Sequence, residues 1–130
     1  MKLIDTDIAI DHFHGHHAAL NYFAQNMAAG ETLAISAITL TELTGGMRSG
    51  EETRTERTLS RFVVLDVNEA IARQAGAYLR QYRHSHKLEL GDALIAATAA
   101  LAGAELVTRN VKHYPMTDIH VVVPYERGQH

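Results

Sequence analysis

Short apolar runs alternate with longer helix-forming stretches along this chain, and no other feature restricts its fold as strongly. The runs that have the length and composition of buried strands are 3–4, 32–36, 62–65, 105–108 and 119–123. The stretches between them carry apolar residues at helical spacing, most clearly 68–82 and 88–101. This alternation predicts an α/β fold in which a mainly parallel sheet is covered by helices. In such folds, ligands bind at the carboxyl ends of the strands.

The length of 130 residues suits one domain with one core. Because 46% of the residues are hydrophobic and 21% are charged, the composition is that of a folded globular protein. We expect a single domain over 1–125 and a short loose tail over 126–130.

The sequence contains no cysteine, which excludes a disulfide framework, a zinc–thiolate site and a thiol nucleophile. The longest weakly polar run, 93–104, is too short to cross a bilayer. A carboxylate at Asp5 also comes too early for the apolar region of a signal peptide. The sequence therefore predicts a cytoplasmic protein with no membrane partner.

The net charge is −3, from 12 basic and 15 acidic residues. Taken alone, this value argues against a nucleic-acid partner, because phosphate neutralisation supplies most of the non-specific affinity of such proteins. The 9 histidines also make the sum dependent on pH. The positions of the acids therefore matter more than their total.

Four acids stand beside apolar residues rather than on a polar face: Asp5, Asp7, Glu42 and Asp92. Asp5 follows the first apolar run, Glu42 lies among leucines, and Asp92 belongs to an otherwise nearly uncharged helix. A carboxylate beside a buried surface is costly unless something pairs with it, and no lysine or arginine accompanies each of them in sequence. If these acids converge at the ends of the strands, a cation must offset their repulsion.

The ligand chemistry indicates which cation this would be. Oxygen ligands, without cysteine or a clear histidine pair, favour Mg²⁺ or Mn²⁺ over zinc. Such an ion activates water and neutralises charge on a phosphoryl oxygen, so the pattern predicts metal-assisted hydrolysis of a phosphodiester.

Each acid also has a purely structural interpretation. Asp5 and Asp7 can cap a helix. Glu42 can form a capping box with Thr39, and Asp92 can interact favourably with a helix dipole. These interpretations do not explain why all four positions coincide in one short chain.

Four segments resemble, in order, the signature segments of PIN-domain ribonucleases. They are Leu3-Ile4-Asp5-Thr6-Asp7-Ile8, the pattern Ser36-x-x-Thr39-x-x-Glu42-Leu43, 91–99 and 106–110. The resemblance extends over about 2–124 and is nearest to the small VapC-type toxins of type II toxin–antitoxin pairs. It implies a PIN-like fold, which is a three-layer α/β/α sandwich around the mainly parallel sheet.

The resemblance also implies the residues of the site. Asp5, Glu42 and Asp92 would hold Mg²⁺ or Mn²⁺, with Glu42 orienting or deprotonating the attacking water. Asn110 would complete the catalytic set at a position where many relatives have aspartate, so a second ion would bind weakly. Side chains that would support the carboxylates or position the substrate are Thr6, Asp7, Thr108 and Arg109. For Arg109, a salt bridge within the fold is at least as good an interpretation.

The function implied by the resemblance is that of a metal-dependent endoribonuclease toxin. It would leave 5′-phosphate and 3′-hydroxyl ends on RNA, form a homodimer, and be neutralised by a cognate antitoxin. The missing fourth acid keeps a second class open, a catalytically weak or inactive PIN-fold interaction module. An aspartate-nucleophile phosphatase is disfavoured, because such enzymes have threonine or valine where this chain has Ala9. If a bound cation offsets the negative charges of the site acids, the rest of the chain is near neutral. The net charge then no longer excludes an RNA substrate.

Three further patterns have ordinary structural interpretations. The histidines at 12, 14, 16 and 17 are interpreted as a solvated loop rather than a metal site. The arginines at 48, 54, 57 and 61 alternate with glutamates, which indicates a solvated helix face more than an RNA-contacting edge. Tyr78 and Tyr82, one helical turn apart, indicate core or interface packing.

Overall fold

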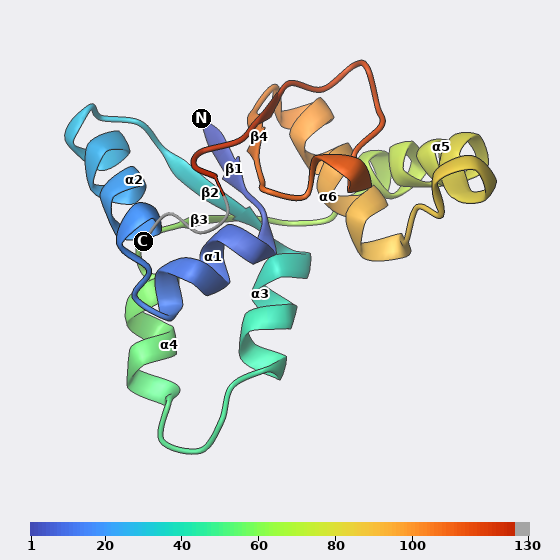
Figure 1. The fold of residues 1–130 in the computed structure, drawn as a ribbon. Helices are drawn as coiled ribbons and strands as arrows, with labels where there is room; N and C mark the ends of the chain where they lie inside the picture. Colours follow the sequence, from blue (N-terminus) through green and yellow to red (C-terminus); the bar gives the residue numbers. More distant parts are fainter. Residues whose placement is uncertain (127–130) are drawn as a thin grey trace.

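Parallel strands form one sheet in the order β3-β2-β1-β4-β5 in the computed structural model of the protein, which describes residues 1–126 (Figure 1). The strands are β1 Lys2–Ile4, β2 Leu33–Ser36, β3 Val63–Leu65, β4 Glu105–Val107 and β5 Val121–Val122. Each adjacent pair in this sheet is parallel. The prediction of a mainly parallel sheet is confirmed.

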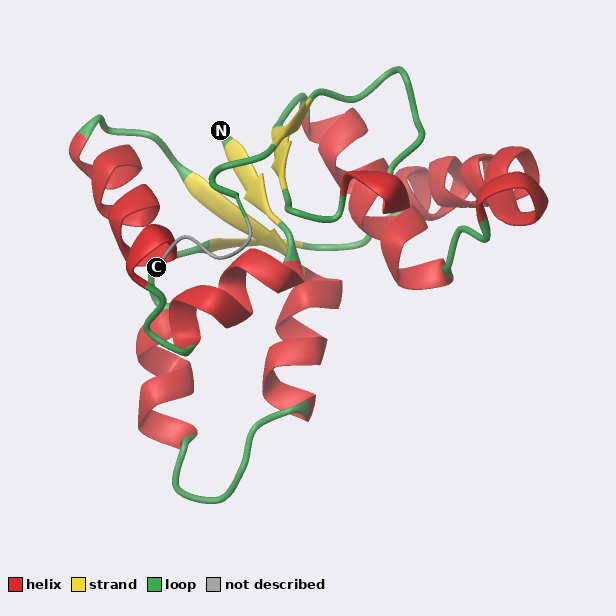
Figure 2. Cartoon of the chain, viewed as in Figure 1, coloured by secondary structure: helices red, strands yellow, loops and turns green. Residues whose placement is uncertain are grey.

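Helices connect the strands and cover both faces of the sheet, as the colours of Figure 2 make clear. They are α1 Thr6–Phe13, α2 His17–Ala28, α3 Ala37–Gly45, α4 Glu52–Leu59, α5 Glu69–His86, α6 Leu90–Ala102 and the short 3-10 helix η1 Val111–His113. Helices α5 and α6 pack on one face, and α1, α2 and α4 on the other (Figure 1). This arrangement is the predicted α/β/α sandwich. None of the helices within 1–126 is long and apolar enough to span a membrane.

The core is divided in two by the alternation of side chains along each strand. In β1, Leu3 packs on the side of α5 and α6, whereas Ile4 packs on the side of α1 and α2. Leu106 and Val107 of β4 repeat this pattern, and all four side chains are fully buried. The central strands are therefore fixed from both faces, which holds their carboxyl ends in place.

Several boundaries differ from those expected from the sequence. Helix α5 continues to His86 rather than ending near 82, because the polar residues after Tyr82 include no helix breaker and the chain turns only at Lys87, in the left-handed conformation. The last strand is shorter than 119–123, since only Val121–Val122 pair with β4. Of the expected tail, residues 127–130 lie outside the described part of the chain.

His12 lies in the core, which corrects its assignment to a solvated loop. Helix α1 continues through Phe13, and the His12 ring stacks on Phe23 with 4.2 Å between the ring centroids. The residue is only 9% exposed, and no described residue offers a hydrogen-bond partner to its buried Nδ1. Burial, assisted by the positive charge of Arg61, lowers the pKa of His12 to about 4. Protonation of His12 therefore opposes folding.

We expect His12 to reduce the stability of the protein as the pH falls from 6.5 to about 4. In this window the unfolded chain binds the proton first, because its histidine has the ordinary pKa. His12→Phe keeps a stacked ring without the titrating group, so its melting temperature should fall less than that of the wild type between about pH 7 and about pH 5. The same substitution at the exposed His84 is the control. Equal pH dependence in the wild type and His12→Phe would contradict this account.

Candidate active site

The carboxyl ends of the three central strands bring polar side chains to one edge of the sheet. β1 leads into Asp5, which caps α1, and β2 ends at Ser36, which caps α3. β4 is followed directly by Thr108. Because β1 pairs in parallel with both β2 and β4, these three positions are neighbours. The strand order therefore brings the carboxyl ends of β2, β1 and β4 together at one edge, where ligands are expected to bind in such a fold.

Asp5 is the most firmly held side chain at this edge. It is 5% exposed, and its Oδ2 accepts hydrogen bonds from Thr108 Oγ1 at 2.8 Å and from the Tyr114 hydroxyl at 2.9 Å. Its Oδ1 accepts one hydrogen bond, from the backbone N–H of Thr6 at 2.8 Å. Since a carboxylate oxygen has two lone pairs, Oδ2 is saturated and Oδ1 retains one acceptor position.

Asp92, in the first turn of α6, lies beside Asp5. The hydroxyl of Tyr114 that binds Asp5 is also 3.4 Å from Asp92 Oδ1, and His113 Nδ1 is 3.3 Å from Asp92 Oδ2. Burial, followed by the negative charge of Asp5, raises the pKa of Asp92. The two carboxylates therefore repel each other across a partly buried space.

Tyr114 remains a donor in this environment. Burial, followed by the charges of Asp5 and Asp92, raises the pKa of Tyr114, so that its hydroxyl keeps its proton. Neither Tyr114 nor His113 is given a role by the sequence patterns. No spacing rule marks Tyr114, because it comes from the irregular segment that follows η1 and reaches the site only through the fold.

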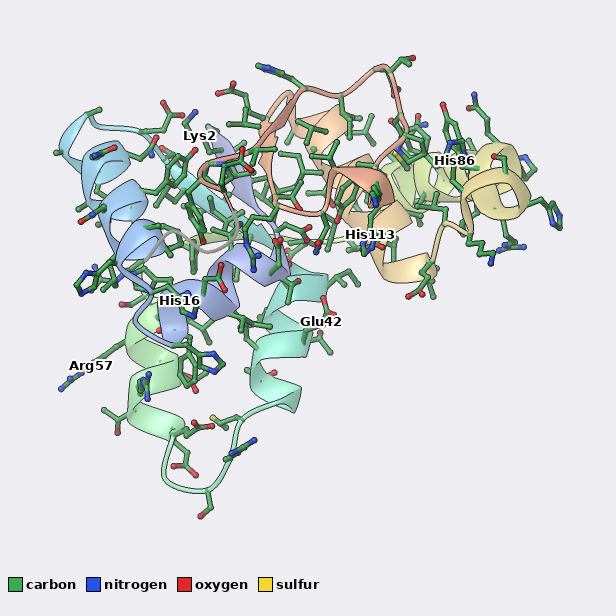
Figure 3. All side chains as sticks on the ribbon, viewed as in Figure 1. Lys2, His16, Glu42, Arg57, His86 and His113 are labelled. Atoms are coloured by element: carbon green, nitrogen blue, oxygen red, sulfur yellow. The ribbon has the colours of Figure 1, made fainter. Side chains whose placement is uncertain are left out.

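Glu42 reaches the same edge from α3 but stands at its rim. The residue is exposed, and its Oε1 accepts a hydrogen bond from Thr6 Oγ1 at 2.8 Å. The Thr6 hydroxyl also contacts that of Thr39 at 2.9 Å. The capping-box interpretation is wrong, because α3 is capped by Ser36, whose Oγ accepts from Ile38 N. Figure 3 shows Glu42 on α3 and His113 on the segment after β4.

Asp7 and Arg109 lie next to Asp5. Asp7 accepts hydrogen bonds from the backbone N–H groups of Arg109, at 2.9 Å, and Ile8, at 2.8 Å. Burial, followed by the charge of Asp5, raises the pKa of Asp7 to about 6. The Arg109 side chain forms a salt bridge with Asp11, with Nη2 3.0 Å from Oδ2, and Asp11 also accepts from the Tyr125 hydroxyl at 2.8 Å. The salt-bridge interpretation of Arg109 therefore describes the structure.

Asn110 follows Arg109 on the loop between β4 and η1. Its backbone N–H donates to Thr108 Oγ1 at 3.0 Å, and the residue is exposed. Thr108 is fully buried and in turn donates to Asp5. Asn110 is thus tied to the hydroxyl that supports Asp5, while its catalytic role remains a prediction.

The oxygen donors at this edge fit a hard divalent cation such as Mg²⁺ or Mn²⁺. Asp5 and Asp92 are brought together, and their repulsion is of the kind that a cation relieves. Within 1–126, however, no three His, Cys, Asp or Glu side chains are grouped closely enough to form a complete metal site, and this includes the histidines between 12 and 17. The expected centre of three carboxylates is present as a pair, with Glu42 as a third acid at the rim.

Comparison with known proteins identifies the family. The PIN domain family model matches residues 2–116. The chain is also 44% identical to ribonuclease VapC10 of Mycobacterium tuberculosis over 117 residues, which cover 89% of this chain and 87% of that protein. This chain therefore belongs to the PIN-domain family, as the four signature segments predicted.

Solved structures agree with this fold. A toxin–antitoxin complex from Klebsiella pneumoniae matches with a TM-score of 0.77 and 38% identity, over 97% of this chain and 99% of that chain. VapBC2 from Rickettsia felis, bound to a DNA fragment from its promoter, matches with a TM-score of 0.80 and 25% identity, over 93% of this chain and 96% of that chain. The PIN-like architecture predicted from the sequence is confirmed.

Proposed function

We propose that this protein is a metal-dependent endoribonuclease that acts as a toxin and is neutralised by a cognate antitoxin. The observation that carries the proposal is the pair formed by Asp5, at the end of the central strand, and Asp92, in the first turn of α6, which share the hydroxyl of Tyr114. The similarity to a protein named as a ribonuclease supports the reaction, and the similarity to a toxin–antitoxin complex supports the partner.

Asp5 and Asp92 would hold Mg²⁺ or Mn²⁺, with Glu42 as the third acid. A cation bound there supplies charge neutralisation at the scissile phosphate and at the leaving 3′ oxygen. The three hydrogen bonds to Asp5 fix the direction of its open Oδ1 position, so binding requires little rearrangement of that side chain.

Glu42 would act on the attacking water. One of its oxygens accepts from Thr6, and because the residue is exposed, its other acceptor positions face solvent. A carboxylate in this position orients a water molecule and accepts its proton. Thr6 and Thr108 hold the catalytic carboxylates, Asp7 binds the backbone after β4, and Asn110 offers an amide oxygen at the edge of the site.

The antitoxin would cover a groove that begins at Glu42. Helices α1, α3 and α4 enclose a groove of about 470 Å³, and its lining includes Ile10, Phe13, Glu42, Leu43, Met47 and Arg48. Ile10 and Met47 are each 38% exposed, so this surface offers apolar contacts to a partner. A segment lying there would also cover Glu42, which lines the groove. The homodimer and the cytoplasmic location rest on the sequence-based expectation and remain proposals.

The proposal is tested by incubating total cellular RNA with the purified protein at increasing Mg²⁺ or Mn²⁺. Cleavage should require the cation, stop when EDTA is added, and resume when Mn²⁺ is supplied in excess. The new ends should carry 5′ phosphate and 3′ hydroxyl groups. An inactive interaction module would leave the RNA intact at every metal concentration.

A further inference from the structure

One hydroxyl group is shared between the two carboxylates of the site. Tyr114 is 3% exposed, and its hydroxyl contacts Asp5 Oδ2 at 2.9 Å and Asp92 Oδ1 at 3.4 Å. A tyrosine hydroxyl carries a single proton, so this proton serves two acceptors. Tyr78 provides a comparison within the same chain: it is equally buried, and its hydroxyl donates to the single carboxylate of Asp118 at 2.8 Å.

We propose that Tyr114 is a positioning residue whose hydroxyl offsets the repulsion between Asp5 and Asp92 and keeps the site assembled before a cation binds. The inference rests on the proposed metal site, because it assigns Tyr114 a role that the cation later takes over. The ring of Tyr114 packs in the core with α5 and α6, so the hydroxyl is the part of the side chain that this role requires.

Asp5 and Asp92 are acids and carry charges of the same sign. Two carboxylates in a partly buried space repel each other more strongly than they would in water. The partial positive charge of the shared proton lies between them and lowers this repulsion. Oδ2 of Asp5 accepts hydrogen bonds from both the Thr108 and the Tyr114 hydroxyl. Oδ1 is therefore the Asp5 oxygen that remains open to a cation.

A bound cation changes how much the Tyr114 hydroxyl contributes to the stability of the protein. Once a divalent charge neutralises the two carboxylates, the repulsion that Tyr114 offsets is largely gone. The hydroxyl should therefore stabilise the metal-free protein more than the metal-bound protein. By linkage, removing the hydroxyl should increase the stabilisation gained when Mn²⁺ binds.

The first test uses the metal-free protein and a double-mutant cycle. Tyr114→Phe should lower the melting temperature by roughly 5 °C. In the background of Asp92→Asn, which keeps the shape of the side chain and removes its charge, the same substitution should cost clearly less. An equal loss in both backgrounds would overturn the proposal, because the hydroxyl would then be an ordinary core hydrogen bond.

The second test measures the rise in melting temperature when Mn²⁺ is added. The rise should be larger for Tyr114→Phe than for the wild type. Tyr78→Phe is the matched control: it also loses a buried hydroxyl bound to an aspartate, but its Mn²⁺ response should equal that of the wild type. If the wild type responds to Mn²⁺, an equal or smaller rise for Tyr114→Phe would overturn the proposal.

The two tests separate this inference from the proposed function. If the wild type did not respond to Mn²⁺ while the double-mutant cycle showed coupling, the metal site would be wrong and the role of Tyr114 in offsetting the repulsion would stand. If the wild type responded and the cycle showed no coupling, the metal site would stand and the role of Tyr114 would be wrong.

Discussion

Asp92→Asn should abolish RNA cleavage and, at the same time, stabilise the metal-free protein. We expect the cleavage rate to fall by roughly 100-fold or more, because a charged ligand at the reacting phosphate is lost. The melting temperature without metal should rise, because the pKa of Asp92 is raised by burial and by Asp5, so that the ionised carboxylate destabilises the fold. Stability and activity would then change in opposite directions at one residue, as expected of a functional site.

The pH dependence checks the cause of this stabilisation. A carboxyl group whose pKa is raised in the folded state opposes folding at neutral pH and ceases to do so as the pH falls and the group is protonated. The difference in melting temperature between Asp92→Asn and the wild type should therefore shrink as the solution is acidified. Equal cleavage by the two proteins in clean preparations would contradict the assignment of Asp92.

Arg109→Met should cause the largest loss of stability among the residues around the site. The substitution leaves Asp11, which is 7% exposed, without its ion pair, while the hydrogen bond from the Tyr125 hydroxyl is kept. An unpaired, nearly buried carboxylate should cost about 3 kcal/mol, which corresponds to a melting temperature lower by roughly 10 °C. At a temperature where the variant is folded, its cleavage rate should stay within a few-fold of that of the wild type.

A matched control and a rescue sharpen this prediction. Arg73→Met removes an arginine that pairs with Glu69 at 2.8 Å, but both side chains are 79% exposed, so the loss should be below about 1 kcal/mol. Adding Asp11→Asn to Arg109→Met should recover part of the lost stability, because the unpaired charge is removed. If Arg109→Met kept the wild-type melting temperature but lost cleavage, Arg109 would contact the substrate instead.

Much of the fold could be predicted because its determinants are local in the sequence. The apolar residues of β1, Leu3 and Ile4, are followed at once by an acid that caps the next helix, and this pattern specifies both the strand and the position of Asp5. Asp92 could be found for a similar reason, since a charge in the alanine-rich helix α6 requires an explanation. That Asp5 and Asp92 would lie close together was then expected from the parallel sheet.

The remainder depends on contacts between distant parts of the chain. His12 belongs to a polar run in the sequence, and it is buried only because α2 folds back and places Phe23 against it. Tyr114 reaches Asp5 from 109 positions away, and Tyr125 reaches Asp11 from 114 positions away. No local pattern encodes these contacts. Glu42 was found from a local pattern, but its distance from the other acids depends on the fold. In the structure it is exposed and accepts a hydrogen bond from Thr6.

The most direct measurement is RNA cleavage by the wild type and by Asp5→Ala, purified in parallel and assayed with Mn²⁺ and with EDTA. Asp5 lies at the end of the central strand and is held by three hydrogen bonds, so the proposed chemistry depends on it more than on any other residue. We expect cleavage in one sample, the wild type with Mn²⁺, and intact RNA in the other three samples. Equal cleavage by the two proteins, or cleavage by the wild type in EDTA, would contradict it.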